Sequence, residues 1–441
     1  MSTKISSPSA RVGRPIAALA LATATLFAVS ACSGAASTEA DGETTLTVQI
    51  SAEWGPMMDI LVSTFEAENP GVTVELQTIT PEQKSTTNSQ LISSSNPPDV
   101  AQASGDWRDL ARNGDLEPLD DIFEEIAPRL TEGTAEQLQV DGTYYGVPTG
   151  NAYVGMAYYN VELFEEAGIE IPADRRIASN ADLYDIVNKL KAVGAEGVAI
   201  GGTGGYQFGW LVDGLLASAT SEEELAGFLS SADPSADLDV SYTDPAFVQS
   251  LETLKAWGDN GVFQEGYLGA DPAQASALYY QGIAGMILGG SWYVGQFEEN
   301  NLEFTSDFLI LPPVDGAEDS KMLLITGTSM VVPSAGANVE LAKKFVELWQ
   351  SDEMQLQAVA NTDFSFPNVT TVDLSALTIA PLGAAIVEQA SSAGTFPMWS
   401  AVVPGPVGQQ VIDPNVQGML AGASTPEEVA AKQQTAIEGA R

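Results

Sequence analysis

From about residue 45 onward the chain alternates strand-like and helix-like stretches, and this alternation limits the possible folds more than any other feature. Leu46–Ile50 and Val72–Leu76 alternate apolar and polar residues as strands do, and a helix is predicted between them over Pro56–Glu68. A polar helix over Pro81–Ser94 and a short strand over Asp99–Ala103 follow. Strands that alternate with helices are typical of an α/β layer architecture with mainly parallel strands.

The same alternation recurs in the second half of the chain. Asn180 is expected to cap a helix that ends at Gly194, because Leu183 and Leu190 share one helical face. The other predicted elements are a strand over Val198–Ile200, buried strands over Ala284–Leu288 and Leu323–Val332, and a surface helix over Val339–Trp349. A chain of 441 residues is long enough for two domains.

The composition of the chain excludes several classes of function. The chain has 59 Asp and Glu against 17 Lys and Arg, a formal charge of −42, so it is not expected to bind nucleic acid or anionic lipid surfaces. The absence of histidine excludes Ser-His-Asp and Cys-His catalysis and imidazole metal sites. The glycine clusters 201–205 and 289–290 lack P-loop and dinucleotide spacing, so we interpret them as tight turns or points of close backbone approach to a neutral ligand. No cofactor and no metal is predicted.

Residues 1–31 have the features of a secretory signal peptide. They carry three cations and no acid, followed by an apolar run from Ile16 to Val29 that is too short to span a membrane. Cys32 is the sole cysteine, and Val29-Ser30-Ala31-Cys32 resembles the bacterial lipobox, which implies lipidation of Cys32. Residues 32–44 are small, polar and acidic, so we expect a lipidated cysteine followed by a flexible tether.

Aromatic residues beside small residues at predicted strand ends are the candidate binding groups. Open α/β sheets place ligands at such ends, and sugars need apolar ring faces together with carboxylate and amide partners for their hydroxyls. Ordinary core packing is the alternative for each ring. The candidate aromatic residues are Trp54, Tyr153, Tyr206, Trp210, Trp292 and Trp399, and the candidate polar partners are Asp106, Asn151 and Asp213.

Several segments, taken in order, resemble the extracellular solute-binding proteins of bacterial ABC importers, in the carbohydrate-binding branch that includes maltose-binding proteins. The matching segments are the lipobox at Cys32, Asn96–Val100 leading to Asp106, Tyr145–Pro148 running into Tyr158–Gly168, Gly289–Trp292, Thr326–Ser329 with Val331–Pro333, and Ala342–Phe345.

The resemblance implies two α/β lobes joined by hinge strands, with a ligand cleft between them. Lobe one would comprise residues 45–150 and 326–370, and lobe two residues 151–325 and 371–441. The implied substrate-binding residues add Ser104 and Gly327 to the candidates above. Where maltose-binding proteins have an acidic residue at the first crossing, this chain has Tyr153, which places maltose itself in doubt.

The function implied by the resemblance is binding, not catalysis. The protein would be a monomer outside the cytoplasm that contacts the membrane only through its lipid anchor, captures a sugar by hinge closure and delivers it to an ABC permease. Two alternatives are a sensory or adhesive lipoprotein of the same fold, and a carboxylate-dependent enzyme that degrades a glycan. Acidic residues are so abundant that a pair suited to glycoside hydrolysis carries no weight.

Overall fold

The computed structural model describes residues 44–51, 54–79, 88–103, 107–131, 134–135, 138–233, 236–317, 319–326, 329–361, 366–373, 380–403 and 407–441. The predicted signal peptide and Cys32 lie outside these residues. The described strands are β1 (Thr44–Ser51), β2 (Val72–Ile79), β3 (Val100–Ala103), β4 (Gln139–Val140), β5 (Thr143–Tyr144), β6 (Gly146–Pro148), β7 (Asn151–Val154), β8 (Met156–Asn160), β9 (Glu196–Ala199), β10 (Ala284–Gly289), β11 (Ser306–Ile310), β12 (Leu323–Thr326), β13 (Ser329–Val331) and β14 (Phe396–Pro397).

Helices connect most of these strands. The described helices are α1 (Gly55–Glu68), α3 (Asn88–Ile92), α4 (Trp107–Arg112), α5 (Asp120–Ile126), α6 (Val161–Glu166), α7 (Asn180–Ala192), α8 (Tyr206–Ala219), α9 (Glu222–Ser230), α10 (Pro245–Asp259), α11 (Pro272–Tyr280), α12 (Tyr293–Glu299), α13 (Val339–Trp349), α14 (Asp352–Asn361), α15 (Pro381–Ala393), α16 (Trp399–Val402), α17 (Gln409–Leu420) and α18 (Pro426–Ala440), with short 3₁₀ turns at Ala127–Arg129 and Tyr267–Gly269.

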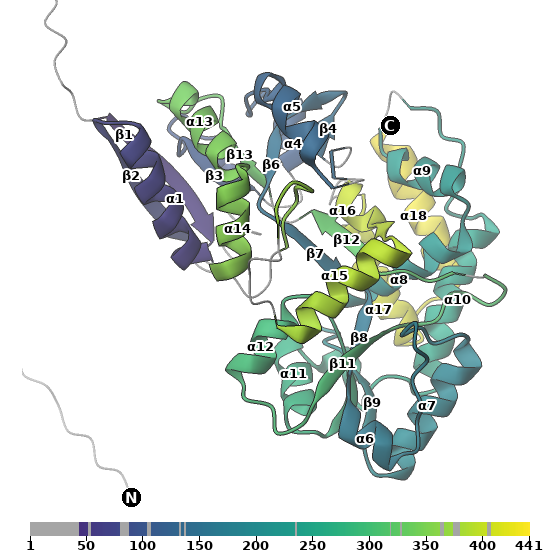
Figure 1. Ribbon diagram of the computed structural model, residues 1–441. Coiled ribbons are helices and arrows are strands. Elements are labelled where there is room, and N and C mark those ends of the chain that lie inside the picture. The colour runs from purple at the N-terminus through teal and green to yellow at the C-terminus, as the bar shows by residue number, and fades with distance from the viewer. Residues whose placement is uncertain are drawn as a thin grey trace, which may run out of the picture. The chain divides into compact units, whose positions relative to one another are not determined.

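A five-stranded sheet, in the order β2-β1-β3-β13-β6, forms the first layer. The alternating apolar side chains of β1, such as Val48, point into a buried cluster that contains Phe65 of α1 and Trp349 of α13. Figure 1 shows α1, α13 and α14 together beside this sheet. Burial of these side chains is the main force that holds the helices on the sheet, and we call this cluster the first core.

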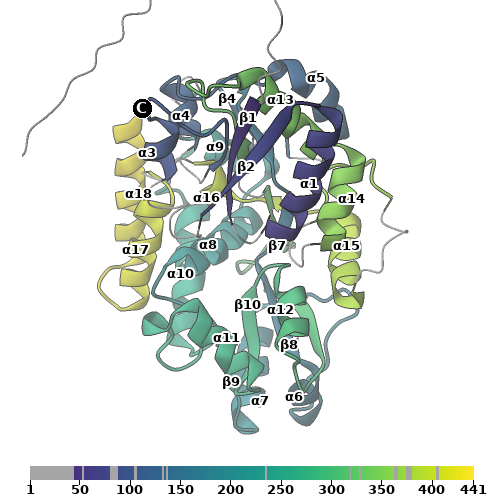
Figure 2. The ribbon, with the colours of Figure 1, turned by 90° about the vertical axis from the view of Figure 1, so that its left-hand side faces the viewer.

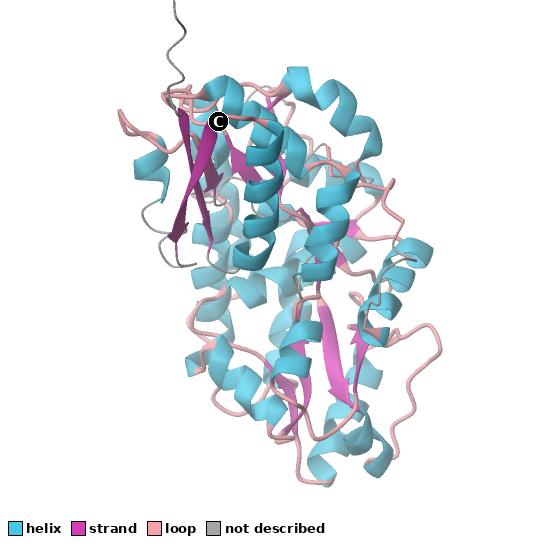
Figure 3. Ribbon diagram, turned by 60° about the vertical axis from the view of Figure 1, so that its left-hand side comes forward, coloured by secondary structure: helices cyan, strands magenta, loops and turns pink. Residues whose placement is uncertain are grey.

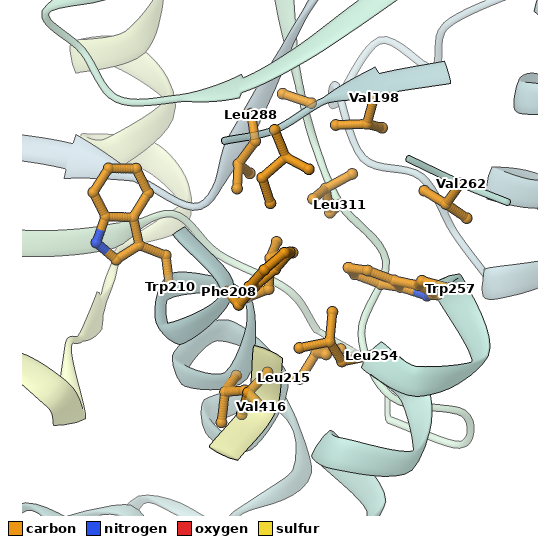
Figure 4. Packing of buried hydrophobic residues seen from close by; sticks show 14 of the residues in the cluster. Val198, Phe208, Trp210, Leu215, Leu254, Trp257, Val262, Leu288, Leu311 and Val416 are labelled. Carbon is orange, nitrogen blue, oxygen red and sulfur yellow. The ribbon is translucent and has the colours of Figure 1, made fainter. Parts of the chain in front are cut away.

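A four-stranded sheet, in the order β11-β8-β10-β9, forms a second layer with helices on both faces (Figure 3). On one face, Tyr158 of β8 packs in a cluster with residues of α11 and α12. On the other face, Val198 and Leu288 meet Phe208 of α8 and Trp257 of α10 (Figure 4). These two clusters are called the second core.

A small third sheet, in the order β14-β12-β7, connects the two larger sheets, and we call it the linking sheet. The chain leaves the five-stranded sheet at β6, passes through β7 and enters the four-stranded sheet at β8. It leaves that sheet at β11, passes through β12 and returns to the five-stranded sheet at β13. β7 and β12 are antiparallel, with Asn151 opposite Thr326 and Val154 opposite Leu323.

The C-terminal helices belong to the second layer. Val369 is buried in the first core, whereas Ile386 of α15 is buried against the four-stranded sheet. The helices α17 and α18 pack against each other and against α8 and α10, as Figure 2 shows. The chain therefore passes between the layers a third time, between Val369 and Ile386.

Four sequence predictions need correction. The N-cap of α7 is Ser179 rather than Asn180, because the Ser179 side chain accepts from the Asp182 N–H. The predicted strand Leu323–Val332 is divided between β12 in the linking sheet and β13 in the five-stranded sheet. The strands are not mainly parallel, because β13 and β8 enter their sheets from the other layer and run antiparallel to both neighbours. The helix predicted to reach Ser94 ends at Ile92, and its first half lies outside the described residues. By contrast, the helix predicted over Val339–Trp349 is confirmed at both ends.

Candidate ligand-binding site

Three of the predicted aromatic residues form a contiguous group, which we call the aromatic row. The ring centroids of Tyr206 and Trp210 lie 5.1 Å apart, and those of Trp210 and Trp292 lie 5.6 Å apart. Both pairs meet edge to face, a favoured geometry for aromatic rings. Tyr206 and Trp210 lie one turn apart on α8, and Trp292 immediately precedes α12. Trp210 is 6% exposed, whereas Tyr206 and Trp292 are half-buried.

The glycines that follow β10 allow this group to form. A Cβ atom on Gly290 would lie 2.3 Å from the indole ring of Trp292, and one on Gly289 would lie 2.5 Å from the ring of Tyr293. No side chain can occupy that space while the rings stay in place. The space beside these glycines is therefore occupied by the rings of Tyr293 and Trp292. The prediction was that a ligand would approach the backbone here.

Tyr153 lies next to the aromatic row. Its backbone N–H donates to Ser291 Oγ at 3.2 Å, and its carbonyl accepts from the Ser291 N–H at 2.8 Å. Because Ser291 immediately precedes Trp292, these two bonds hold β7 beside the row. The Tyr153 ring also lies 5.5 Å from the ring of Phe366.

Asn151 starts β7 and is 1% exposed. Its backbone exchanges hydrogen bonds of 2.9 and 3.0 Å with Phe366, and its Nδ2 donates to Thr131 Oγ1 at 2.6 Å. Its Oδ1 is buried and has no hydrogen-bond partner among the described residues. A buried amide oxygen without a donor is unfavourable, so Asn151 retains the capacity to accept a bond from a ligand or a water.

A cavity of about 540 Å³ lies over one face of the linking sheet. Tyr153, Leu324 and Pro397 occupy neighbouring register positions on three strands and line it together. Thr131, which follows a residue of the first core, contributes to the wall, and so does Lys321 near the second core. The remaining lining residues are Glu222, Ala390, Ser391, Gly394 and Thr395. Parts of both layers thus border one cavity.

The tyrosines of this region carry neutral hydroxyl groups. Burial raises the pKa of Tyr206 to about 12, with a smaller contribution from Tyr293. Burial likewise raises the pKa of Tyr153. Both hydroxyls therefore stay protonated near neutral pH and can donate or accept hydrogen bonds without a charge.

Three predicted site residues are enclosed by the protein itself. Trp54 is 4% exposed and meets the Trp349 ring edge-on at 5.4 Å within the first core. Trp399 is 1% exposed, and its Nε1 donates to the Tyr242 hydroxyl at 2.7 Å. Asp213 is 1% exposed and accepts from Ser400 N–H at 3.1 Å and from Ser400 Oγ at 2.5 Å. These side chains do not join the aromatic row.

The remaining predicted site residues, Ser104, Asp106 and Gly327, lie outside the described residues. In the described part of the chain, the structure adds buried polar groups that the sequence did not single out. Gln49 and Ser51 of β1 and Asn88 of α3 each have a buried side-chain oxygen without a partner among the described residues. Gln49 and Ser51 share one face of β1. Polar side chains at two successive positions of one strand face could have indicated these buried polar groups from the sequence.

Two further observations concern the described residues. No group of three or more acidic or cysteine side chains in this part of the chain is placed to hold a metal ion. Among the same residues, no helix has the length and apolarity needed to cross a membrane.

The fold defines a class of protein in which two α/β layers, linked by paired strands, border a cavity. Comparison with known proteins gives the family, since bacterial extracellular solute-binding proteins match residues 44–356. The chain belongs to this family, and it has the two-lobe α/β fold of solute-binding proteins of ABC transporters.

Individual relatives agree with this assignment. A protein of Brucella abortus, named as a binding protein, is 26% identical over 376 residues, covering 82% of this chain and 85% of its own. An uncharacterized ABC transporter extracellular-binding protein of Pyrococcus horikoshii is 25% identical over 60% of this chain and 57% of its own. The solved structure of a chitin oligosaccharide binding protein superimposes with a TM-score of 0.76 at 25% identity, covering 90% of this chain and 99% of that one. The relatives are binding proteins rather than enzymes.

Proposed function

We propose that this solute-binding protein captures a sugar or oligosaccharide beside the aromatic row and passes it to an ABC permease. The observation that carries the proposal is the joining of the row to the linking strand β7 through Ser291. A ligand that lies on Trp292 would therefore contact the strand about which the two layers move.

The chemistry of the described site suits a neutral, hydroxylated ligand. Half-buried Trp292 and Tyr206 offer apolar surface to the C–H faces of sugar rings. The neutral tyrosine hydroxyls and the unpartnered Oδ1 of Asn151 can exchange hydrogen bonds with sugar hydroxyls. The relative that binds chitin oligosaccharides supports the same ligand class.

The proposal includes the lobes expected from the sequence, with lobe one at residues 45–150 and 326–370 and lobe two at residues 151–325 and 371–441. The separate cores of the two larger sheets and the passage of the chain through β7 and β12 support this division. A change in the backbone angles of these two paired strands would rotate one lobe against the other and close the site.

The proposal also includes the membrane attachment. Residues 1–31 are removed as a signal peptide, Cys32 receives the lipid, and the monomeric protein works outside the cytoplasm, held to the membrane by that lipid alone. The lipobox and the family of extracellular proteins support this location. We expect the protein to have no enzymatic activity of its own.

A ligand screen tests the proposal. The protein without residues 1–32 is mixed with mono- and oligosaccharides, amino acids and short peptides, and tryptophan emission and melting temperature are recorded. A sugar should shift both, and Trp292→Ala should weaken its binding by about tenfold, which corresponds to about 1.4 kcal/mol. The matched control is Trp257→Phe in the second core, which should lower the melting temperature and leave the affinity unchanged.

The outcomes separate the alternatives. Binding of peptides but not sugars would contradict the sugar assignment while keeping the solute-binding function. Release of shorter products from an oligosaccharide would contradict the absence of enzymatic activity. Sugar binding together with unchanged sugar uptake in a deletion strain would favour a sensory or adhesive role.

A further inference from the structure

A buried carboxyl group lies against the helix that carries two residues of the aromatic row. Asp413 of α17 is 8% exposed, and its Oδ1 is buried without a hydrogen-bond partner among the described residues. A Cβ atom on Gly209 would lie 2.7 Å from this oxygen, and one on Gly205 would lie 2.8 Å from the Asp413 Cβ. Glycines at these two positions allow the carboxyl group to lie directly on the first turns of α8.

A second buried carboxyl group lies one turn further along α8. Asp213 follows Gly209 by four residues, so the two positions share one face of the helix. Both oxygens of Asp213 accept bonds from Ser400, one from its N–H and one from its hydroxyl. Ser400 adjoins Trp399 on α16, so Asp213 holds α16 against α8.

The hydrogen bonds distinguish the two acids. Asp213 accepts two bonds from Ser400, which favour its ionised form, whereas Asp413 has a buried oxygen with no donor among the described residues, which favours its protonated form. A negative charge on Asp413 opposes a negative charge on Asp213, because both carboxyl groups are buried along the same helix. The most favourable state of the pair therefore has one proton, with Asp413 protonated and Asp213 ionised.

We propose that Asp213 and Asp413 are positioning residues that share one proton and hold α8, with Tyr206 and Trp210, in its ligand-binding arrangement. The proposal rests on the proposed function, because the aromatic row is taken as the ligand site. Loss of the proton places an unpaired charge against Gly205 and Gly209. Gain of a second proton weakens the two bonds from Ser400. Ligand affinity should therefore be greatest when one proton is bound.

Burial raises the pKa of both groups to about 7, and the charge of Asp413 adds to the rise at Asp213. Because the two acids interact, their titration is expected in two steps, one on either side of this value. The bonds from Ser400 act in the opposite direction on the pKa of Asp213.

The other titratable and charged groups near Asp213 and Asp413 are not expected to produce the same pH dependence. Tyr242 of the second core feels the charge of Asp213, and burial raises its pKa far above neutrality. Lys321 lines a small cavity together with Trp210 and Gly214 of α8, and its ammonium group lies 3.4 Å from Asp319. On α17, Asn415 accepts a bond from Lys432 of α18. The charged residues of α10 include Lys255, which pairs with Asp259 at 2.7 Å, and the exposed Glu252.

The test measures the affinity for the chitin disaccharide from pH 5 to pH 9. The wild-type protein should bind most tightly near pH 7 and about tenfold more weakly at both limits. Asp413→Asn keeps a neutral side chain at that position and should lose only the alkaline decline. Asp213→Asn should lose the acidic decline and bind more weakly throughout. Glu252→Gln, an exposed acid on α10, is the matched control and should keep the wild-type profile.

A flat wild-type profile, or a profile that neither Asn variant changes, would overturn the proposal and leave the proposed function intact. If the wild-type protein does not bind the disaccharide, the emission of the ligand-free protein is titrated over the same pH range. Two transitions that the Asn variants remove singly would then support the shared proton, and their absence would overturn it.

Discussion

At the residue scale, Gly290 shows how one missing side chain positions an aromatic platform. The indole ring of Trp292 lies where a Cβ atom of Gly290 would be, and its other neighbour is the ring of Trp210. The position of Trp292 therefore depends on a glycine two residues before it. A change at Gly290 should act on the proposed ligand site without removing any group that we propose to contact the ligand.

Gly290→Ala should displace Trp292 and weaken sugar binding by about tenfold, or about 1.4 kcal/mol. Gly214→Ala is the matched control on α8, because a Cβ atom there meets nothing within 4 Å. Replacing a helical glycine by alanine should stabilise the protein by about 0.5–1 kcal/mol and leave the affinity unchanged. Calorimetric titration and urea unfolding measure the two effects. Unchanged affinity in Gly290→Ala would show that Trp292 is not a contact of the ligand.

The sequence suggested candidate aromatic residues for the site, but it did not indicate which of their side chains are enclosed by the protein. Trp292 and Trp399 each lie beside small residues, yet Trp292 is half-buried and Trp399 is 1% exposed beneath Tyr242. The difference arises because α16 packs on α8 and α9. No local pattern encodes such packing between segments nearly 200 residues apart.

At the element scale, α7 shows both the strength and the limit of periodicity. The apolar spacing correctly predicts its buried face, with Leu183, Ile186, Val187 and Leu190. Its N-cap is Ser179 rather than Asn180, because Ser179 accepts from the Asp182 N–H. Asn180 instead accepts from Trp257 Nε1 at 2.6 Å and donates to Pro313 O at 3.2 Å. Both residues favour N-caps, and the tertiary contact with Trp257 decides between them.

Ser179→Ala should therefore destabilise the protein by about 1 kcal/mol through loss of the cap. Asn180→Ala should have a larger effect, on the order of 2–3 kcal/mol, because it leaves the buried Trp257 N–H without its acceptor. Chemical unfolding monitored by circular dichroism gives both values. Equal effects of the two substitutions would contradict this division of roles.

The division of residues 323–332 between two sheets belongs to the same scale. An apolar run of this length is typical of a buried strand, and both β12 and β13 are buried. The pattern carries no information about which sheet each half joins, because Thr326 pairs with Asn151 and Ser329 pairs with Ala103 through long-range contacts. The resemblance to solute-binding proteins, rather than periodicity, placed a crossing there.

At the scale of the whole molecule, acidic residues make the stability depend on pH. Burial raises the pKa of Asp213 and Asp413 to about 7 from the ordinary value of 3.8. The folded state therefore binds more protons than the unfolded state between about pH 4 and pH 7, so the free energy of unfolding falls as pH rises through this window. Repulsion among the groups that make up the formal charge of −42 acts in the same direction.

We expect urea unfolding to show higher stability at pH 6 than at pH 8, with a smaller difference in Asp413→Asn. The exposed acid Glu252, replaced by Gln, serves again as the control. An equal change in the free energy of unfolding between pH 6 and pH 8 in the wild-type protein and in Asp413→Asn would contradict the raised pKa of Asp413.

We propose that a sugar is captured by closure of the two lobes about β7 and β12. Small-angle X-ray scattering of residues 33–441, with and without a saturating sugar identified in the screen, measures this closure. We expect a smaller radius of gyration with the sugar, and no change when Trp292→Ala is measured at a sugar concentration that this variant does not bind. A sugar that binds tightly and leaves the radius of gyration of the wild-type protein unchanged would contradict it.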